Sequence, residues 1–243
     1  MILDAPGHRD FVPNMIMGAS QADCAILVID GNISEFERGF DGGGTKEHAI
    51  LARSLGVTQV CVAVNKLDLV DWSSSRFAEI KARVQPFLKQ IGFREESISF
   101  VPISGLVGIN LSERPDPKDY PLLTEWYQGP CLVEILDSMK LPKRNSTKPM
   151  RICVYDYYKS TEGTIIGDCI QAKIDSGIIK DKDSVLLMPL NHIVQIKSIE
   201  ISKKRVPFAA PGDLCDISLV IPPSLDPSYI KPGNVLCDPK YPI

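Results

Sequence analysis

The sequence predicts an α/β domain followed by an all-β antiparallel barrel, because the pattern of apolar residues changes part-way along the chain. In the first part, near-continuous apolar and β-branched runs at 24–30 and 60–65 alternate with amphipathic stretches. Strands of a parallel sheet that are buried on both faces have this composition. In the second part the runs become short and are separated by turn residues, as in a small antiparallel barrel.

Amphipathic stretches in the first part predict helices between the strands. Stretch 45–55 carries apolar residues at helical spacing, with Thr45 placed as its N-cap and Gly56 as its C-terminal stop. The same period and short apolar runs predict further helices at 76–91 and 131–139 and further strands at 1–3 and 99–102. Residues 112–129 hold three prolines without any periodicity, which indicates a surface insertion.

The border between the two parts is expected after residue 145, in a polar segment bracketed by Pro142 and Pro149. The predicted domains are therefore 1–145 and 146–243. Barrel strands are expected at 151–156, 169–174, 185–189, 193–201, 214–220 and 235–237.

Composition excludes several classes of protein. The chain has 27 basic and 30 acidic residues, so an electrostatic DNA binder is not expected, although a local patch could still contact RNA. It shows no apolar run long enough to span a membrane and no secretory signal, so we expect a cytoplasmic protein without a membrane partner. The 7 cysteines are scattered singly, which favours free thiols over disulfides or a zinc site.

The first motif of interest is the run 4–8, which follows the strand-like residues 1–3. A carboxylate and a glycine at the carboxyl end of a parallel strand are where α/β sheets bind metal and phosphate. Asp4 would hold Mg²⁺, through water, and the Gly7 N–H would face a terminal phosphate. His8 is the candidate catalytic residue, since a polar side chain beneath a γ-phosphate can hold the attacking water. The alternative is a capped turn with an incidental surface histidine.

The second motif is Asn65-Lys66-Leu67-Asp68, which begins at the end of the predicted strand formed by residues 60–64. Asp68 can accept hydrogen bonds from both the ring N–H and the exocyclic amine of guanine, which would select GTP over ATP. Asn65 would bridge the base and neighbouring loops, and the aliphatic stem of Lys66 would lie along the base.

A third motif, Ser104-Gly105-Leu106, follows the run that ends at Pro102. Its small residues would bring a backbone N–H to the guanine carbonyl oxygen. Because three such loops occur in the right order, each after a predicted strand, we expect a guanine nucleotide, GTP or GDP, as the ligand.

These three motifs resemble the third, fourth and fifth guanine-binding motifs of translational GTPases. The similarity extends to the elongation-factor-1A and termination-factor-3 branch, through residues 35–40 and 45–49. Segments 53–59 and 126–132 are most similar to the Hbs-one-like group of that branch.

The resemblance implies a P-loop GTPase domain, a second-domain barrel and a monomer that hydrolyses GTP on the ribosome. In this family the residues matching Asp4 and His8 organise Mg²⁺ and position the hydrolytic water. The residues matching Asn65, Lys66, Asp68, Ser104, Gly105 and Leu106 bind the base. The Hbs-one-like group further implies Pelota as partner, mainly through a third domain, in rescue of stalled ribosomes and mRNA surveillance.

Two other functions stay open at this point. The chain could be an elongation-factor-1A or termination-factor-3 paralogue that delivers tRNA or a release factor, or a nucleotide-free ribosome-binding module. No G-x-x-x-x-G-K-S/T occurs, so the sequence is expected to be an incomplete copy that lacks the P-loop and switch I. Loss of at least four charge-assisted phosphate contacts would weaken its nucleotide binding by roughly 6 kcal/mol.

Overall fold

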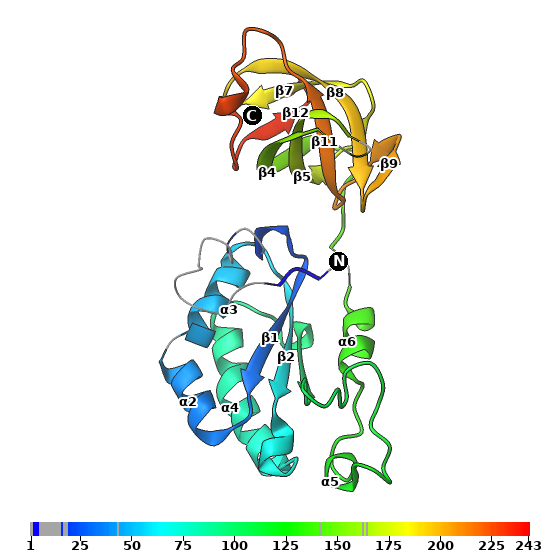
Figure 1. The fold of residues 1–243 in the computed structure, drawn as a ribbon. Coiled ribbons are helices and arrows are strands. Elements are labelled where there is room, and N and C mark those ends of the chain that lie inside the picture. The colour runs from blue at the N-terminus through cyan, green and yellow to red at the C-terminus, as the bar shows by residue number, and fades with distance from the viewer. Residues whose placement is uncertain are drawn as a thin grey trace. The chain divides into compact units, whose positions relative to one another are not determined.

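The computed structural model describes residues 2–4, 16, 19–42, 44–140, 142–161, 163 and 165–243. The chain divides into two units, Met1–Leu141 and Pro142–Ile243 (Figure 1). This division falls four residues before the border at 145 that the sequence suggests. The difference has a local cause, since Arg144 donates to the Pro211 carbonyl (3.1 Å) and Asn145 forms a β-bridge with Ser176. These contacts tie the end of the linker to the second unit.

A parallel sheet forms the centre of the first unit, as the sequence predicts. Among the described residues it contains β1 (Cys24–Asp30), β2 (Gln59–Asn65) and β3 (Ile98–Pro102), in the order β1-β2-β3. The register places Asp30 beside Asn65, so the last residues of β1 and β2 are neighbours at the carboxyl edge. Polar residues that follow these strands are therefore brought to one edge of the sheet.

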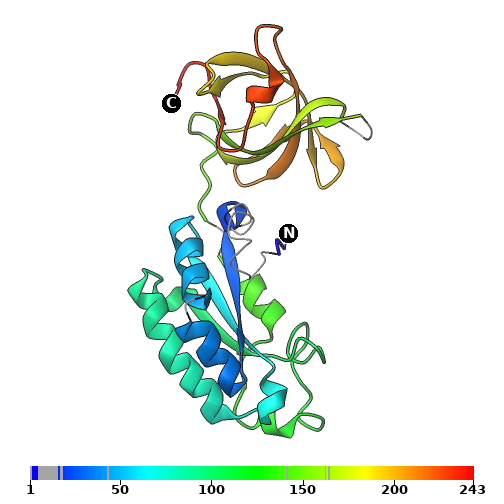
Figure 2. The same ribbon diagram turned by 60° about the vertical axis from the view of Figure 1, so that its left-hand side comes forward.

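Helices cover both faces of this sheet (Figures 1 and 2). The described helices are α2 (Ile33–Asp41), α3 (Gly44–Ser54), α4 (Ser74–Gln90), α5 (Pro121–Thr124) and α6 (Leu132–Ser138), with 3-10 turns η2 (Leu67–Val70) and η3 (Glu95–Ser97). Val60, Val62 and Val64 pack with α2, α3 and α4, whereas Cys61 and Ala63 pack with Ile135 of α6. Alternate residues of β2 thus pack into two different cores, which is why residues 60–64 are continuously apolar.

The ends of the helices confirm the predicted stop at Gly56 but not the predicted cap at Thr45. Gly56 and Gly92 follow α3 and α4 at φ +102° and +101°, the left-handed conformation of a C-terminal stop. The Ser73 hydroxyl accepts from the backbone N–H of Arg76 and caps α4. The prediction for Thr45 was wrong, because α3 begins at Gly44 and Thr45 therefore lies inside its first turn.

The strand expected at residues 1–3 is absent from the described part of this segment. Ile2, Leu3 and Asp4 are exposed and form neither helix nor strand. An extended segment of this length needs a neighbouring strand for its backbone hydrogen bonds, and the described residues provide none beside it.

The segment 112–129 is a largely exposed connection, yet contacts with α6 and with the first core anchor it. Leu123 of α5 is fully buried, and the indole N–H of Trp126 donates to the Trp72 carbonyl (2.8 Å).

The second unit is a closed antiparallel barrel. Its ring is β11 (Leu214–Val220), β5 (Gly167–Ser176), β4 (Arg151–Ser160), β12 (Val235–Cys237), β7 (Ser184–Met188) and β8 (His192–Ile201), closed by pairing of β11 with β8. All six of these strands overlap the predicted ones. The sequence did not predict the short strands β6 (Ile179–Lys180), β9 (Lys204–Val206) and β10 (Phe208–Ala209), or the turn η4 (Pro227–Tyr229).

All seven cysteines are free thiols, and five of them are buried. Within the residues that the structure describes, no helix combines the length and apolarity that a membrane span requires.

Candidate nucleotide-binding site

Asn65 joins two loops at the carboxyl edge of the sheet. Its side-chain oxygen accepts hydrogen bonds from the backbone N–H of Lys66 (2.9 Å) and from that of Gly105 (2.8 Å). Lys66 adopts φ +59°, a left-handed conformation that turns the chain sharply after β2. One amide oxygen therefore fixes the loop after β2 against the loop after β3.

The Lys66 side chain is held from the neighbouring strand. Its ammonium lies 2.7 Å from the carboxylate of Asp30, the last residue of β1, and half of its side chain remains exposed. The hydrogen bond to Asp30 raises the pKa of Lys66. Sequence reasoning did not single out Asp30, although its position at the end of the run 24–30 placed it at this edge.

Asp68 lies in η2, which is anchored by the fully buried Leu67. The backbone N–H of Trp72 donates to the Leu67 carbonyl (2.9 Å), closing this turn. The Oδ1 atom of Asp68 is buried and has no hydrogen-bond partner among the described residues. A buried carboxylate oxygen without a donor is costly, so this atom is suited to a ligand that supplies N–H groups.

The loop after β3 brings Ser104, Gly105 and Leu106 to the same edge. Ser104 pairs with Ile109 in a β-bridge that closes the loop, and its buried hydroxyl has no hydrogen-bond partner in the described part of the chain. Gly105 has little room for a side chain, since a Cβ there would lie 3.3 Å from the Asn65 Oδ1. Leu106 is 95% exposed at the tip.

Asn110 supports this loop and was not found from the sequence. It is buried at φ +58°, and its amide donates to the Pro102 carbonyl (2.9 Å) across the base of the loop. The available signal was an asparagine two positions after Gly108, since asparagine is one of the few residues besides glycine that tolerate the left-handed conformation.

The structure brings together the predicted residues of the second and third motifs at the carboxyl edge of the sheet. The described segment 2–4 lies near the start of β1, at the opposite end of the sheet from Asn65 (Figures 1 and 2). The predicted role of Asp4 in holding Mg²⁺ stays a prediction. Gly7 and His8 lie outside the described residues. Across the described residues, His, Cys, Asp and Glu side chains form no cluster of three that could hold a metal ion.

Comparison with known proteins gives the family. Residues 1–149, more than half of the chain, match the family described as "Elongation factor Tu GTP binding domain". The chain belongs to this family of translational GTPases. The identification confirms the resemblance drawn from the three motifs and from the barrel that follows them.

Among curated relatives, this translational GTPase is 43% identical to Protein HBS1 of Drosophila melanogaster over all 243 residues, which is 35% of that protein. It is 41% identical to elongation factor 1-alpha of Tetrahymena pyriformis over 98% of the chain and 53% of that protein. The chain thus spans about a third to a half of the curated relatives that it matches.

Solved structures agree on the fold. The Ski7 GTPase-like domain of S. cerevisiae, solved bound to GTP, aligns with a TM-score of 0.71 at 19% identity over 93% of this chain and 55% of that one. Elongation factor SelB of Methanococcus maripaludis, in its apo form, aligns with a TM-score of 0.66 at 20% identity over 98% and 46% of the two chains.

Proposed function

We propose that this protein binds GTP and GDP through the loops after β2 and β3 and hydrolyses GTP as a translation factor on the ribosome. The observation that carries the proposal is the arrangement around Asn65. Its amide holds the two loops together, while the buried Asp68 Oδ1 lacks a donor in the described structure. A guanine base would supply N–H donors for this buried carboxylate oxygen.

The chemistry of guanine fits these groups. Its ring N–H and exocyclic amine are adjacent donors, and the Asp68 carboxylate can accept both. Its carbonyl oxygen would accept from a backbone N–H of the loop 104–106, and the stem of Lys66 would cover the base. Adenine offers no ring donor at the corresponding position, so Asp68 would discriminate between the purines.

Hydrolysis of GTP to GDP and phosphate is proposed for the whole protein at the level of the family. His8 would hold the attacking water in line with the γ-phosphate. Mg²⁺, when bound, would neutralise charge on the phosphates, and Asp4 would hold it through water. His8→Ala should abolish ribosome-stimulated hydrolysis and leave GDP binding intact. Equal loss of both would contradict this role.

Rescue of stalled ribosomes and mRNA surveillance, with Pelota as partner, is the specific function that we propose. It is supported by the 43% identity to Protein HBS1 along the entire chain. Such a factor would act as a monomer in the cytoplasm and contact Pelota mainly through a third domain. Delivery of tRNA is the second candidate, because the identity to elongation factor 1-alpha is nearly as high.

Asp68→Asn tests the base contact. An amide presents a donor where the carboxylate only accepts, so the preference should move from guanine toward xanthine nucleotides. Asp71→Asn is the matched control, since Asp71 is exposed, lies three positions on and adopts a left-handed φ of +50° that asparagine tolerates. An unchanged preference in Asp68→Asn, measured by competition between GDP and xanthosine diphosphate, would contradict the assignment.

A further inference from the structure

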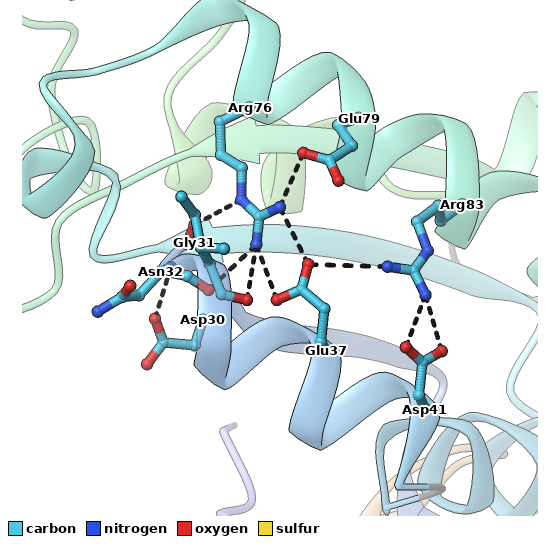
Figure 3. Close-up of polar contacts among 9 residues, drawn as sticks. Asp30, Gly31, Asn32, Glu37, Asp41, Arg76, Glu79 and Arg83 are labelled. Atoms are coloured by element: carbon cyan, nitrogen blue, oxygen red, sulfur yellow. Dashed lines mark hydrogen bonds and ion pairs between the residues drawn. The ribbon is translucent and has the colours of Figure 1, made fainter.

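A buried arginine on α4 forms hydrogen bonds with the turn that connects β1 to α2, residues 30–33 (Figure 3). Arg76 is only 7% exposed. Its guanidinium donates to three consecutive backbone carbonyls and to two carboxylates, those of Gly31 (3.0 Å), Asn32 (3.1 Å), Ile33 (3.2 Å), Glu37 (3.1 Å) and Glu79 (2.8 Å).

The same turn is bonded on its other side to the base motif. The backbone N–H of Gly31 donates to the Asn65 carbonyl (2.7 Å). Asp30 accepts from Lys66 through one carboxylate oxygen and from the backbone N–H of Asn32 through the other (2.9 Å). Asp30 is therefore oriented by the turn and in turn orients Lys66.

Packing at Gly31 makes this connection stiff. A Cβ at Gly31 would lie 2.9 Å from the Leu67 Cδ1 and 3.0 Å from the Asn65 carbonyl oxygen. The turn is pressed against the motif 65–68 from one side and held by Arg76 from the other. A shift of the turn would be transmitted directly to Asn65 and Lys66.

We propose that Arg76 is a positioning residue for the guanine site, acting through the turn 30–33 on Asn65 and Lys66. This role rests on the proposed binding of guanine nucleotides. Arg76 holds the turn in a position that allows two contacts. Asp30 forms its ion pair with the Lys66 ammonium, and the Gly31 N–H donates to the Asn65 carbonyl.

The geometry requires an arginine. The planar guanidinium carries five N–H donors in a fixed arrangement. In Arg76 these donors bind carbonyls of the turn together with one carboxylate on α2 and one on α4. A lysine would keep the charge, but its three donors radiate from one nitrogen and cannot reach the carbonyls of Gly31 and Ile33 together. Arg76→Lys therefore removes the hydrogen bonds to the carbonyls of the turn, while it retains a cation beside Glu37 and Glu79.

Arg83→Lys is the matched control. Arg83 lies seven positions further along α4, donates to Asp41 (2.7 Å), approaches Glu37 (3.7 Å) and stacks on Phe36 with 5.0 Å between its guanidinium carbon and the ring centroid. Arg76 makes a comparable contact with the same ring at 5.3 Å. Of the two arginines, only Arg76 bonds to the carbonyls of the turn.

The test measures the affinity of the 243-residue chain for GDP. The binding is monitored by NMR at a temperature well below unfolding. We expect Arg76→Lys to weaken GDP binding about fivefold, within the range for coupling through packed networks, and Arg83→Lys to leave it within about twofold. Equal affinity of the two variants would overturn the role of Arg76. A wild-type chain that fails to bind GDP would instead overturn the proposed function.

Asp30→Asn provides the second variant, since the Asp30 side chain is partly exposed and an asparagine keeps an oxygen that can accept from the Asn32 N–H. It should also weaken GDP binding, and the double variant with Arg76→Lys should be no weaker than Arg76→Lys alone. An additive double variant would mean that Arg76 supports the fold without acting through the turn.

Discussion

The side-chain oxygen of Asn65 lies 2.8 Å from the backbone nitrogen of Gly105, 40 positions further along the chain. This contact fixes the loops that follow two neighbouring parallel strands, β2 and β3. The carboxyl edge of such a sheet is where α/β proteins bind their ligands. The geometry of the site therefore depends on one amide.

Asn65→Ala should separate the two loops. The N–H groups of Lys66 and Gly105 would lose their acceptor, at a cost of about 1 kcal/mol each, and guanine binding should be lost. Asn65→Asp retains an acceptor oxygen and should keep most of the stability. Both tryptophans, Trp72 and Trp126, lie in the first unit, so unfolding followed by their fluorescence measures this loss. Equal stability of Asn65→Ala and wild type would contradict the bridging role.

The two units should respond separately to cavities in their cores. Ile80→Ala, in the fully buried face of α4, should lower the free energy of unfolding of the first unit by about 2–4 kcal/mol. Ile170→Ala leaves a cavity of the same kind in the barrel and should not move the tryptophan transition. Circular dichroism detects both changes. A tryptophan transition that shifts equally in the two variants would show that the units unfold together.

The start of α6 should be sensitive to acid through Glu134. Its hydrogen bond with Arg114, assisted by the Cys131 backbone N–H, lowers the pKa of Glu134 from 4.5 to about 2. A lowered pKa stabilises the fold fully above pH 4.5, and this stabilisation is lost as the pH falls through about 2. The stability difference between wild type and Glu134→Gln should therefore shrink between these pH values. A difference that stays constant from pH 6 to pH 2.5 would contradict this effect.

Thiol labelling should detect the hydrogen bond between the Cys153 thiol and the Asp175 carboxylate (2.9 Å). Burial, followed by the hydrogen bond to Asp175, raises the pKa of Cys153 to about 12. Asp175→Asn removes the carboxylate, so the pKa should fall and labelling of Cys153 should be several-fold faster at pH 8. Cys24, in the other unit, serves as the internal control in mass spectrometry of the labelled peptides. Unchanged labelling of Cys153 would mean that burial alone sets its reactivity.

The barrel was predictable because its strands alternate between two environments. In β8, Val194 and Ile196 face the core while Gln195 and Lys197 are exposed, and this period of two is visible in the sequence. Strands of two or three residues, such as β10, are too short to show any period. Helix α2 escaped prediction because only Phe36 and Phe40 are buried in it and Gly39 interrupts the pattern.

The site was predictable to the extent that its residues belong to local motifs. Asn65, Asp68 and Ser104 each lie within a few residues of a recognisable strand end. The sequence therefore predicted that they lie together at the carboxyl edge of the sheet. Arg76 gave no such signal, because its contacts with the turn join residues 43 or more positions apart. Asp30 did lie at a predicted strand end, at the last position of the run 24–30, but its contact with Lys66 joins residues 36 positions apart. The strand prediction was wrong at Ile2 and Leu3, because apolar residues suggest a strand but do not supply a neighbouring strand to pair with.

Titration of the isotope-labelled 243-residue chain with GDP and with ADP tests the central claim most directly. The account predicts that the amide signals of Lys66 and Gly105 shift saturably with GDP at concentrations up to about 10 mM, which corresponds to weak binding by the base alone, and do not shift with ADP. Shifts of equal size with both nucleotides, or none with GDP, would contradict a guanine site at these loops.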